Sequence, residues 1–175
     1  MVVALRSQSD WYRQHDLLDE ADAVLEAIDI YEKSGCDYFA TLKELNARID
    51  LSRMTKAGPL SLARHWLRRN WKMPPGINDR MVAKLYKQSE WERSHDLLDE
   101  ADAFLVVVDI YEKNKGDYRT TLAVLGKMIA THGFSDALDL TRARDWFRRN
   151  WIEYAPPIKP PTEPAPKKSG LFGRR

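Results

Sequence analysis

The stretch His15-Asp-Leu-Leu-Asp-Glu-Ala-Asp-Ala23 decides the fold, because it returns unchanged as His95-Asp-Leu-Leu-Asp-Glu-Ala-Asp-Ala103. The two copies are 80 residues apart (95 − 15 = 80), and the same offset relates Arg68-Arg-Asn-Trp71 to Arg148-Arg-Asn-Trp151. Roughly half of the positions between residues 11 and 71 are identical in the second copy. The chain therefore contains a duplicated unit, and its period is far longer than the roughly 34 residues of a tetratricopeptide repeat.

Composition predicts a soluble, folded protein. Hydrophobic residues make up 43% of the 175 positions, which is enough for a core, and the net charge is only +2. The single cysteine, Cys36, has no partner for an internal disulfide, which favours a reducing compartment. The start of the chain lacks the long apolar core and the cleavage site that are expected of a signal peptide, and no apolar run approaches the roughly 18 residues of a membrane span. We therefore expect a cytoplasmic protein.

The first predicted helix of each copy is long and unbroken, from about Ser9 to about Lys33 in copy one. In copy two, Ser89 and Glu92 have the spacing of a capping box, which would mark the start of this helix. The sequence leaves open whether a helix through residues 81–87 stops at Ser89 or continues. The core-facing stripe of copy one is predicted to comprise Leu18, Ala21, Leu25 and Ile28.

Two further helices are predicted in each copy. Asp37 and Asp117 are well placed to cap the second helix, and Gly58-Pro59 marks the turn before the third helix of copy one. The third helix has an apolar stripe that comprises Leu60, Ala63, Leu67 and Trp71. No strand pair or hairpin signal occurs, so the predicted fold class is all-α, with two tandem three-helix units.

The predicted organisation has four parts. Residues 5–72 form the first unit, residues 73–80 a Pro-Pro-Gly linker, and residues 81–153 the second unit. Residues 154–175 are rich in proline and carry basic residues at the end, with too few apolar side chains to fold alone. We expect this last part to be a disordered tail.

Acidic side chains form a line along the first predicted helix, beside its core-facing stripe. Carboxylates that are partly shielded from water need partners, and the nearest arginines are expected on the third helix of the same unit. We therefore predict ion pairs inside each unit that fix the register of its helices. The candidates are Asp19, Asp22, Asp29, Arg64 and Arg68 in copy one, and Asp99, Asp102, Asp109, Arg144 and Arg148 in copy two.

No catalytic or metal-binding constellation emerges. His15 and Asp19 have a chelating i, i+4 spacing, but zinc sites draw on several His or Cys, and no Glu-x-x-His of a di-iron bundle occurs. The string Leu18-Asp-Glu-Ala-Asp22 is similar to the acidic motif of DEAD-box helicases, yet the phosphate-binding loop that works with this motif is absent from the sequence. We predict a non-enzymatic protein without metal or cofactor.

Duplicated helical units without catalytic residues usually present surfaces to other proteins, so a protein-interaction or scaffold module is the predicted function. Positions that differ between the copies would then set the partner. Val106, Val124 and Arg119 replace Glu26, Glu44 and Phe39, and are the candidate partner surface. A homodimer through this surface is a further expectation.

The alternative function is nucleic-acid binding, because aromatic and basic residues can stack on bases and neutralise phosphates. Its candidate residues are Arg68, Arg69, Trp71, Arg148, Arg149 and Trp151, together with the basic tail. The nearly balanced net charge and the acidic line in each copy favour the protein-interaction function instead.

Overall fold

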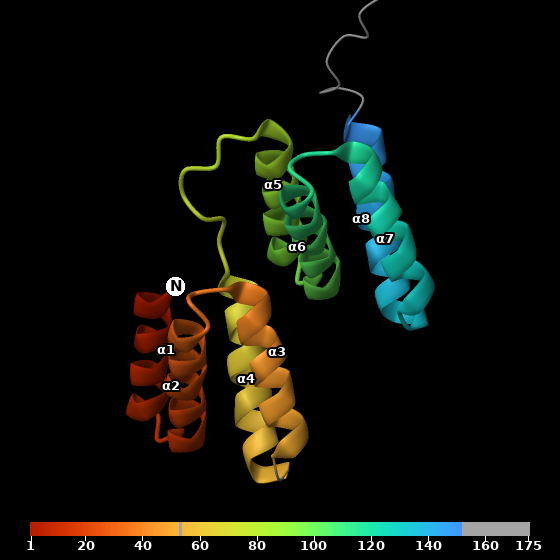
Figure 1. Ribbon diagram of the computed structural model, residues 1–175. Coiled ribbons are helices and arrows are strands. Elements are labelled where there is room, and N and C mark those ends of the chain that lie inside the picture. The colour runs from red at the N-terminus through yellow and green to blue at the C-terminus, as the bar shows by residue number, and fades with distance from the viewer. Residues whose placement is uncertain (53, 152–175) are drawn as a thin grey trace, which may run out of the picture.

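The computed structural model describes residues 1–52 and 54–151, which form eight α-helices and no strand (Figure 1). The helices are α1 (Val2–Gln14), α2 (Leu18–Lys33), α3 (Tyr38–Leu51), α4 (Met54–Asn70), α5 (Arg80–Ser94), α6 (Leu98–Lys113), α7 (Tyr118–Thr131) and α8 (Phe134–Trp151). The predicted all-α class is confirmed. The predicted tail, residues 154–175, lies outside the described residues. None of the described helices has the length and apolar character that crossing a membrane requires.

Each half of the described chain contains four helices, not the three that we predicted. We call α1–α4 unit 1 and α5–α8 unit 2. Helices α6 and α7 begin 80 residues after α2 and α3 (98 − 18 = 80; 118 − 38 = 80). In both units a first helical hairpin packs beside a second one, and the segment between α4 and α5 connects the units (Figure 1).

The extra helix arises because the long first helix breaks after His15. Asp16 adopts a left-handed backbone with φ of +57°, and the Leu17 N–H donates to the Tyr12 carbonyl oxygen at 3.0 Å, as in a Schellman helix end. The His15 imidazole donates through Nδ1 to the Trp11 carbonyl oxygen at 2.7 Å and stacks on the Trp11 ring. The equivalent residues of unit 2 repeat this turn. His15 therefore caps α1.

Several predicted helix ends need correction. Ser89 lies inside α5, and its hydroxyl donates to the Ala101 carbonyl oxygen of α6 at 2.8 Å, so the predicted capping box is wrong. Gly58-Pro59 lies inside α4 and is not a turn. The caps predicted at Asp37 and Asp117 are confirmed, because each carboxylate accepts a hydrogen bond from a backbone N–H of the first turn.

Helix α2 buries two faces, because α1 packs on one side and α4 on the other. Its buried residues are Ala21, Ala23, Val24, Ala27, Ile28 and Ile30. Two leucines of the predicted core stripe, Leu18 and Leu25, are exposed instead. The stripe of α4 is buried as predicted, from Leu60 to Trp71.

Candidate interaction surface

Unit 1 and unit 2 meet at the carboxylate of Asp102, on α6. Arg68 of α4 donates to Asp102 from Nε at 2.8 Å and to Asp99 from Nη2 at 2.5 Å. The Tyr38 hydroxyl, at the start of α3, donates to Asp102 at 2.6 Å. A residue of unit 2 completes the set, because Arg93 Nη2 of α5 donates to Asp102 at 2.8 Å. Asp102 thus joins three donors, two of which come from unit 1.

Arg93 is the most deeply buried charge of this junction, with 3% of its side chain exposed. Its guanidinium lies 5.2 Å from the ring centroid of Tyr38 and 5.6 Å from that of Trp71, and it also donates to the Arg68 carbonyl oxygen. The Trp71 ring stacks on Tyr86 of α5 at 5.7 Å. The buried arginine is therefore held by rings and acceptors from both units.

Aromatic and apolar side chains line the rest of the junction. Phe39 and Trp71 of unit 1 share a small crevice with Leu105 and Val108 of unit 2. At the margin of the junction, Arg69 Nη1 lies 3.7 Å from an Asp96 carboxylate oxygen. Burial and the charge of Asp102 both raise the pKa of Tyr38, so its hydroxyl stays protonated and keeps donating.

We name the two sides of this junction. The α4 end is the side that unit 1 contributes, and comprises Tyr38, Arg68, Arg69 and Trp71. The α6 face is the stripe of unit 2 that receives it, and comprises Leu98, Asp102, Leu105 and Asp109, with Arg93 of α5 beside it.

The arrangement of the predicted ion pairs differs from the expected one, because Arg68 contacts the aspartates of the other unit. Arg68 pairs with Asp99 and Asp102 and does not reach Asp22, whose ion-pair partner is Arg13 of α1 at 3.5 Å. The acidic line of unit 1 is consequently left without arginines from α4, and Asp19 and Asp22 are exposed.

The other candidates pair locally. Arg64 Nη1 donates to the Asn46 side chain at 2.5 Å, and Arg144 lies 2.9 Å from the neighbouring Asp145. Asp29 and Asp109 each pair one turn along their own helix, with Lys33 and Lys113. Arg148 is exposed and makes no ion pair within residues 1–52 and 54–151.

The α2 face is the stripe of unit 1 that matches the α6 face, and comprises Leu18, Asp22, Leu25 and Asp29, with Arg13 of α1 beside it. Its residues are identical in type to those of the α6 face, but no other helical unit within residues 1–52 and 54–151 covers them. Leu18 is 60% exposed and Leu98 7%, and Leu25 is 38% exposed and Leu105 3%. The side chains of Asp22 and Asp102 are 75% and 17% exposed, and those of Arg13 and Arg93 are 53% and 3% exposed.

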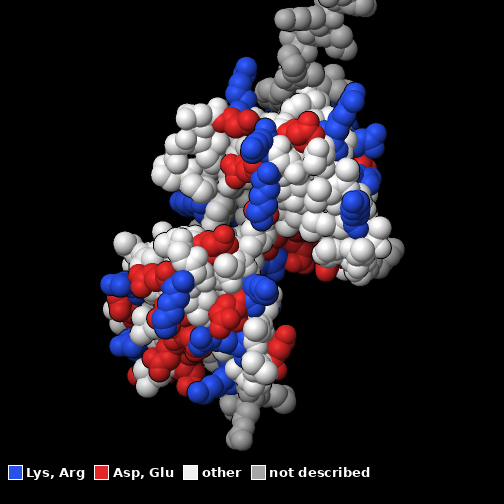
Figure 2. Space-filling view, in the orientation of Figure 1, with Lys and Arg blue, Asp and Glu red and all other residues white. Residues whose placement is uncertain are grey.

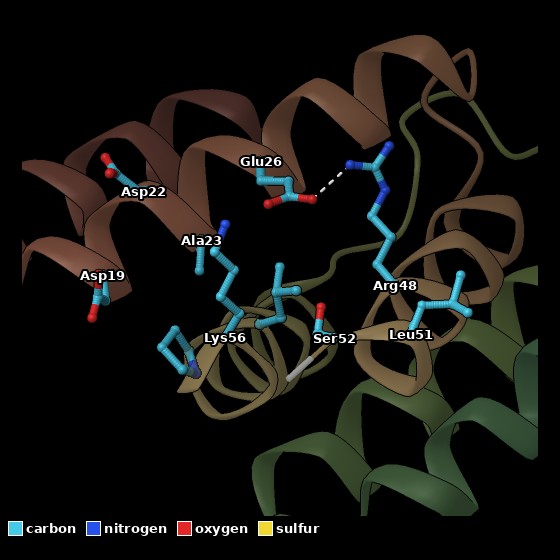
Figure 3. Close-up of a pocket in the computed structure, with 10 residues that line it drawn as sticks. Asp19, Asp22, Ala23, Glu26, Arg48, Leu51, Ser52 and Lys56 are labelled. Atoms are coloured by element: carbon cyan, nitrogen blue, oxygen red, sulfur yellow. Dashed lines mark hydrogen bonds and ion pairs between the residues drawn. The ribbon is translucent and has the colours of Figure 1, made fainter. Parts of the chain in front are cut away.

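The α2 face borders a groove of about 520 Å³ between α2 and the end of the α3–α4 hairpin (Figure 3). Glu26 and Arg48 form an ion pair across it at 2.6 Å, and Asp19 and Asp22 line it farther along α2. The equivalent groove of unit 2 holds about 210 Å³, and Arg68 is among the residues that line it. In Figure 2, acidic and basic side chains intermingle over the α1–α2 side of unit 1.

The predicted partner surface of unit 2 divides into two parts. Val106 and Val124 are partly buried against the core, as is Met128. In unit 1 the corresponding residues are Glu26, Glu44 and Arg48, and Arg48 pairs with both glutamates. An ionic cluster thus replaces an apolar one, which explains these two differences by packing. Arg119 is exposed at the start of α7.

The nucleic-acid candidates are in different environments. Arg68 and Trp71 belong to the junction, where the Arg68 guanidinium is held by two aspartates and Trp71 is buried. Arg69 is half-exposed at its margin, and Arg148 and Arg149 are exposed. Within the described part of the chain, no three His, Cys, Asp or Glu side chains are grouped so that they could hold a metal ion.

Sequence reasoning missed Arg93 and Tyr38 as residues of the junction. Both have exact counterparts at the 80-residue offset, Arg13 and Tyr118, and these shared positions were the available signal. Comparison of the chain with family models, with curated proteins and with solved structures finds no match.

Proposed function

We propose that this chain is a non-enzymatic protein-interaction module, and that its α2 face is a docking surface for another protein. One observation carries the proposal: a face of the same residues, the α6 face, binds the end of a helical hairpin within this chain. On α2 these residues include exposed Leu18 and Leu25 with the carboxylate of Asp22 between them. Apolar side chains flanked by charges are typical of protein-binding surfaces.

The chemistry of the α2 face defines the partner class. Carboxylates at Asp19 and Asp22 favour an arginine, which can donate to two acceptors at once as Arg68 does to Asp99 and Asp102. Leu25 favours an apolar or aromatic side chain, since Leu105 lines the same crevice of the junction as Phe39 and Trp71. The proposed partner is therefore a helical segment that carries arginine and aromatic residues near its end.

Photo-crosslinking in the native host tests this proposal. A benzophenone amino acid at Leu25 is expected to crosslink to protein, and Asp22→Arg is expected to lower the yield of that product roughly tenfold because it reverses the charge that an arginine needs. The matched control places the same amino acid at Lys43, which is exposed on α3 away from the groove. Equal crosslinking from both positions, or products that are unaffected by Asp22→Arg, would contradict the proposal.

Nucleic-acid binding is the competing function and has its own readout. Fluorescence anisotropy with single- and double-stranded DNA and RNA at about 50 mM salt is expected to show no binding, because part of the arginine and tryptophan set is enclosed in the junction. Tight binding that weakens with salt and with Arg148→Glu would favour the nucleic-acid function instead.

A further inference from the structure

Unit 2 carries its own version of the α4 end. We call it the α8 end, and it comprises Tyr118, Arg148, Arg149 and Trp151, which correspond one by one to Tyr38, Arg68, Arg69 and Trp71. The Tyr118 and Trp151 rings stack at 4.8 Å, as the equivalent pair of unit 1 packs at 5.1 Å. Arg148 and Arg149 are exposed, and Trp151 is half-buried.

The chain therefore presents both halves of its internal junction a second time, at two separate places. The acceptor half is the α2 face of unit 1, and the donor half is the α8 end of unit 2. The ion pair beside the acceptor carboxylate is also present in both units. Arg13 Nη2 lies 3.5 Å from Asp22 Oδ1, and in unit 2 Arg93 Nη2 lies 2.8 Å from Asp102 Oδ1.

We propose that the α8 end of one chain docks on the α2 face of a second chain, so that the protein associates with itself head to tail. This inference rests on the proposed function, and it names the partner as a second copy of this chain. Arg148 takes the place of Arg68 and donates to Asp19 and Asp22, and Trp151 covers the stripe that contains Leu25.

The charges of the two surfaces complement each other where the junction is polar. Arg149 meets Asp16, as Arg69 meets Asp96 at 3.7 Å. Arg119 replaces Phe39, whose crevice in the junction is also lined by Asp109 and Glu112. In the contact between chains, Arg119 therefore faces their counterparts, the carboxylates of Asp29 and Glu32.

Two other differences affect the strength of the contact. Arg6 replaces Tyr86, so Trp151 meets a guanidinium where Trp71 meets a ring. Asp145 replaces His65, so in the contact between chains it faces the carboxylate of Asp16. Arg144, however, already pairs with Asp145 at 2.9 Å. The contact between chains also lacks the covalent connection that raises the effective concentration of the internal junction to roughly millimolar. It is consequently weaker than the internal one and depends on concentration.

The geometry makes this association heterologous, since each chain uses one surface to bind and a different one to be bound. A dimer formed this way retains one free α2 face and one free α8 end. Further chains can therefore add, in contrast to a symmetric dimer, which stops at two.

Two variants of the 175-residue chain test this arrangement, each with one surface blocked. Asp22→Arg reverses the charge of the α2 face, and Arg148→Ala removes the guanidinium of the α8 end. By analytical ultracentrifugation from about 10 µM to about 1 mM, the wild type is expected to grow beyond two chains, while each variant alone stays a monomer. An equimolar mixture restores one functional contact, and is expected to give a dimer and no larger species.

Matched controls are Asp50→Arg and Lys127→Glu, which reverse exposed charges outside both surfaces and are expected to associate as the wild type does. Circular dichroism checks that all variants are folded. The proposal is overturned if the wild type stays monomeric up to about 1 mM, if the mixture stays monomeric, or if either blocked variant associates like the wild type.

These outcomes separate the inference from the proposed function. A monomeric wild type whose position 25 still crosslinks to a different protein in the host overturns self-association and leaves the α2 face as a docking surface. A monomeric wild type without any such crosslink overturns both. In the first case the occupant is another protein, and its sequence can be compared with the α8 end.

Discussion

Unit 1 and unit 2 place the same residues on one face of their second helix, yet those residues have different environments. The α6 face receives the α4 end of unit 1 through Asp102, and its Leu98 and Leu105 are buried. No described helix of unit 2 lies over the α2 face, and its Leu18 and Leu25 are exposed. The helices have the same bounds at an offset of 80 (98 − 18 = 80), and local folding therefore does not explain the difference.

The comparison shows that the same face residues have different roles, depending on whether another helical unit lies against them. On α6, the carboxylate of Asp102 is part of a shielded cluster with Arg68 and Arg93, where each charge depends on the others. On α2, the carboxylate of Asp22 is hydrated and contributes little to stability. Leaving the α2 face exposed therefore costs little stability. Its side chains are available for the same type of contact that the α6 face makes.

The largest expected effect comes from removing the shared carboxylate. Asp102→Ala removes the carboxylate that the guanidiniums of Arg68 and Arg93 share, and is expected to lower the free energy of unfolding by about 3–5 kcal/mol. Asp22→Ala is the matched variant of unit 1, and is expected to cost less than about 0.5 kcal/mol because the side chain is mostly exposed. Urea denaturation followed by circular dichroism measures both. Similar losses for the two variants would show that the junction is not formed in solution.

The apolar part of the comparison is tested by shortening one leucine in each unit. Leu105→Ala removes a buried side chain at the crevice shared with Phe39 and Trp71, and is expected to cost about 3 kcal/mol. Leu25→Ala is expected to cost less than about 1 kcal/mol, because water already reaches this side chain. Thermal denaturation at protein concentrations near 5 µM, roughly where a weak contact between chains is absent, provides the measurement. A cost at Leu25 that equals the cost at Leu105 would mean that the α2 face is already covered within one chain.

The sequence was sufficient to predict most helix positions but not the number of helices. The caps at Asp37 and Asp117 and the stripe of α4 follow from local rules. The sequence does not predict the break at Asp16, because the helical spacing of apolar residues continues through the turn and no glycine or proline marks it. Aspartate is one of the few side chains that adopt φ near +57° at modest cost, and here this conformation accompanies the hydrogen bond of His15 to the Trp11 carbonyl oxygen at the end of α1.

The partner of Arg68 was beyond sequence reasoning for a different reason. Duplication gives unit 1 and unit 2 the same aspartates, so an arginine of α4 has chemically identical acceptors in its own unit and in the next one. Spacing along the chain favours the nearer set, Asp19 and Asp22, whereas the structure joins Arg68 to Asp99 and Asp102. Only the relative placement of the helices decides between them, and that placement depends on contacts such as Trp71 with Tyr86.

A smaller effect is expected at alkaline pH. It comes from Tyr86, a tyrosine of the junction that unit 1 replaces with Arg6. Burial, followed by the charges of Glu112 and Asp109, raises the pKa of Tyr86 from 10.0 to about 12. The unfolded chain loses this phenolic proton near pH 10, so the folded state is progressively disfavoured between pH 10 and pH 12. The stabilisation is fully present below pH 10 and is lost as the pH rises through the folded pKa.

Tyr86→Phe tests this pH dependence. The wild type is expected to lose about 1.4 kcal/mol per pH unit through this group above pH 10, and the variant is expected to lack that part of the decline. Urea midpoints at pH 8, 10 and 11 compare the two proteins, and the difference between them should be constant up to pH 10. A parallel decline in both proteins at pH 11 would place Tyr86 in contact with water.

The smallest expected effect concerns the cluster that is ionic in unit 1 and apolar in unit 2. Arg48→Met removes the partner of Glu26 and Glu44, and is expected to cost about 0.5–1 kcal/mol because both ion pairs are half-exposed. Replacing all three residues by their unit 2 counterparts, Glu26→Val, Glu44→Val and Arg48→Met, is expected to restore stability to within about 0.5 kcal/mol of the wild type. The recovery follows because an apolar cluster needs no ionic partners.

The triple variant sharpens the comparison because it separates cluster chemistry from the docking surface. Glu26 lines the groove beside the α2 face but is not part of that face. Self-association should therefore persist in the triple variant, although the interaction energy between Glu26 and Arg48 is lost. If the triple variant were less stable than Arg48→Met alone, the three positions would not act as one cluster. The difference between the units at Val106 and Val124 would then need an explanation other than packing, and a partner surface on unit 2 would be the next to test.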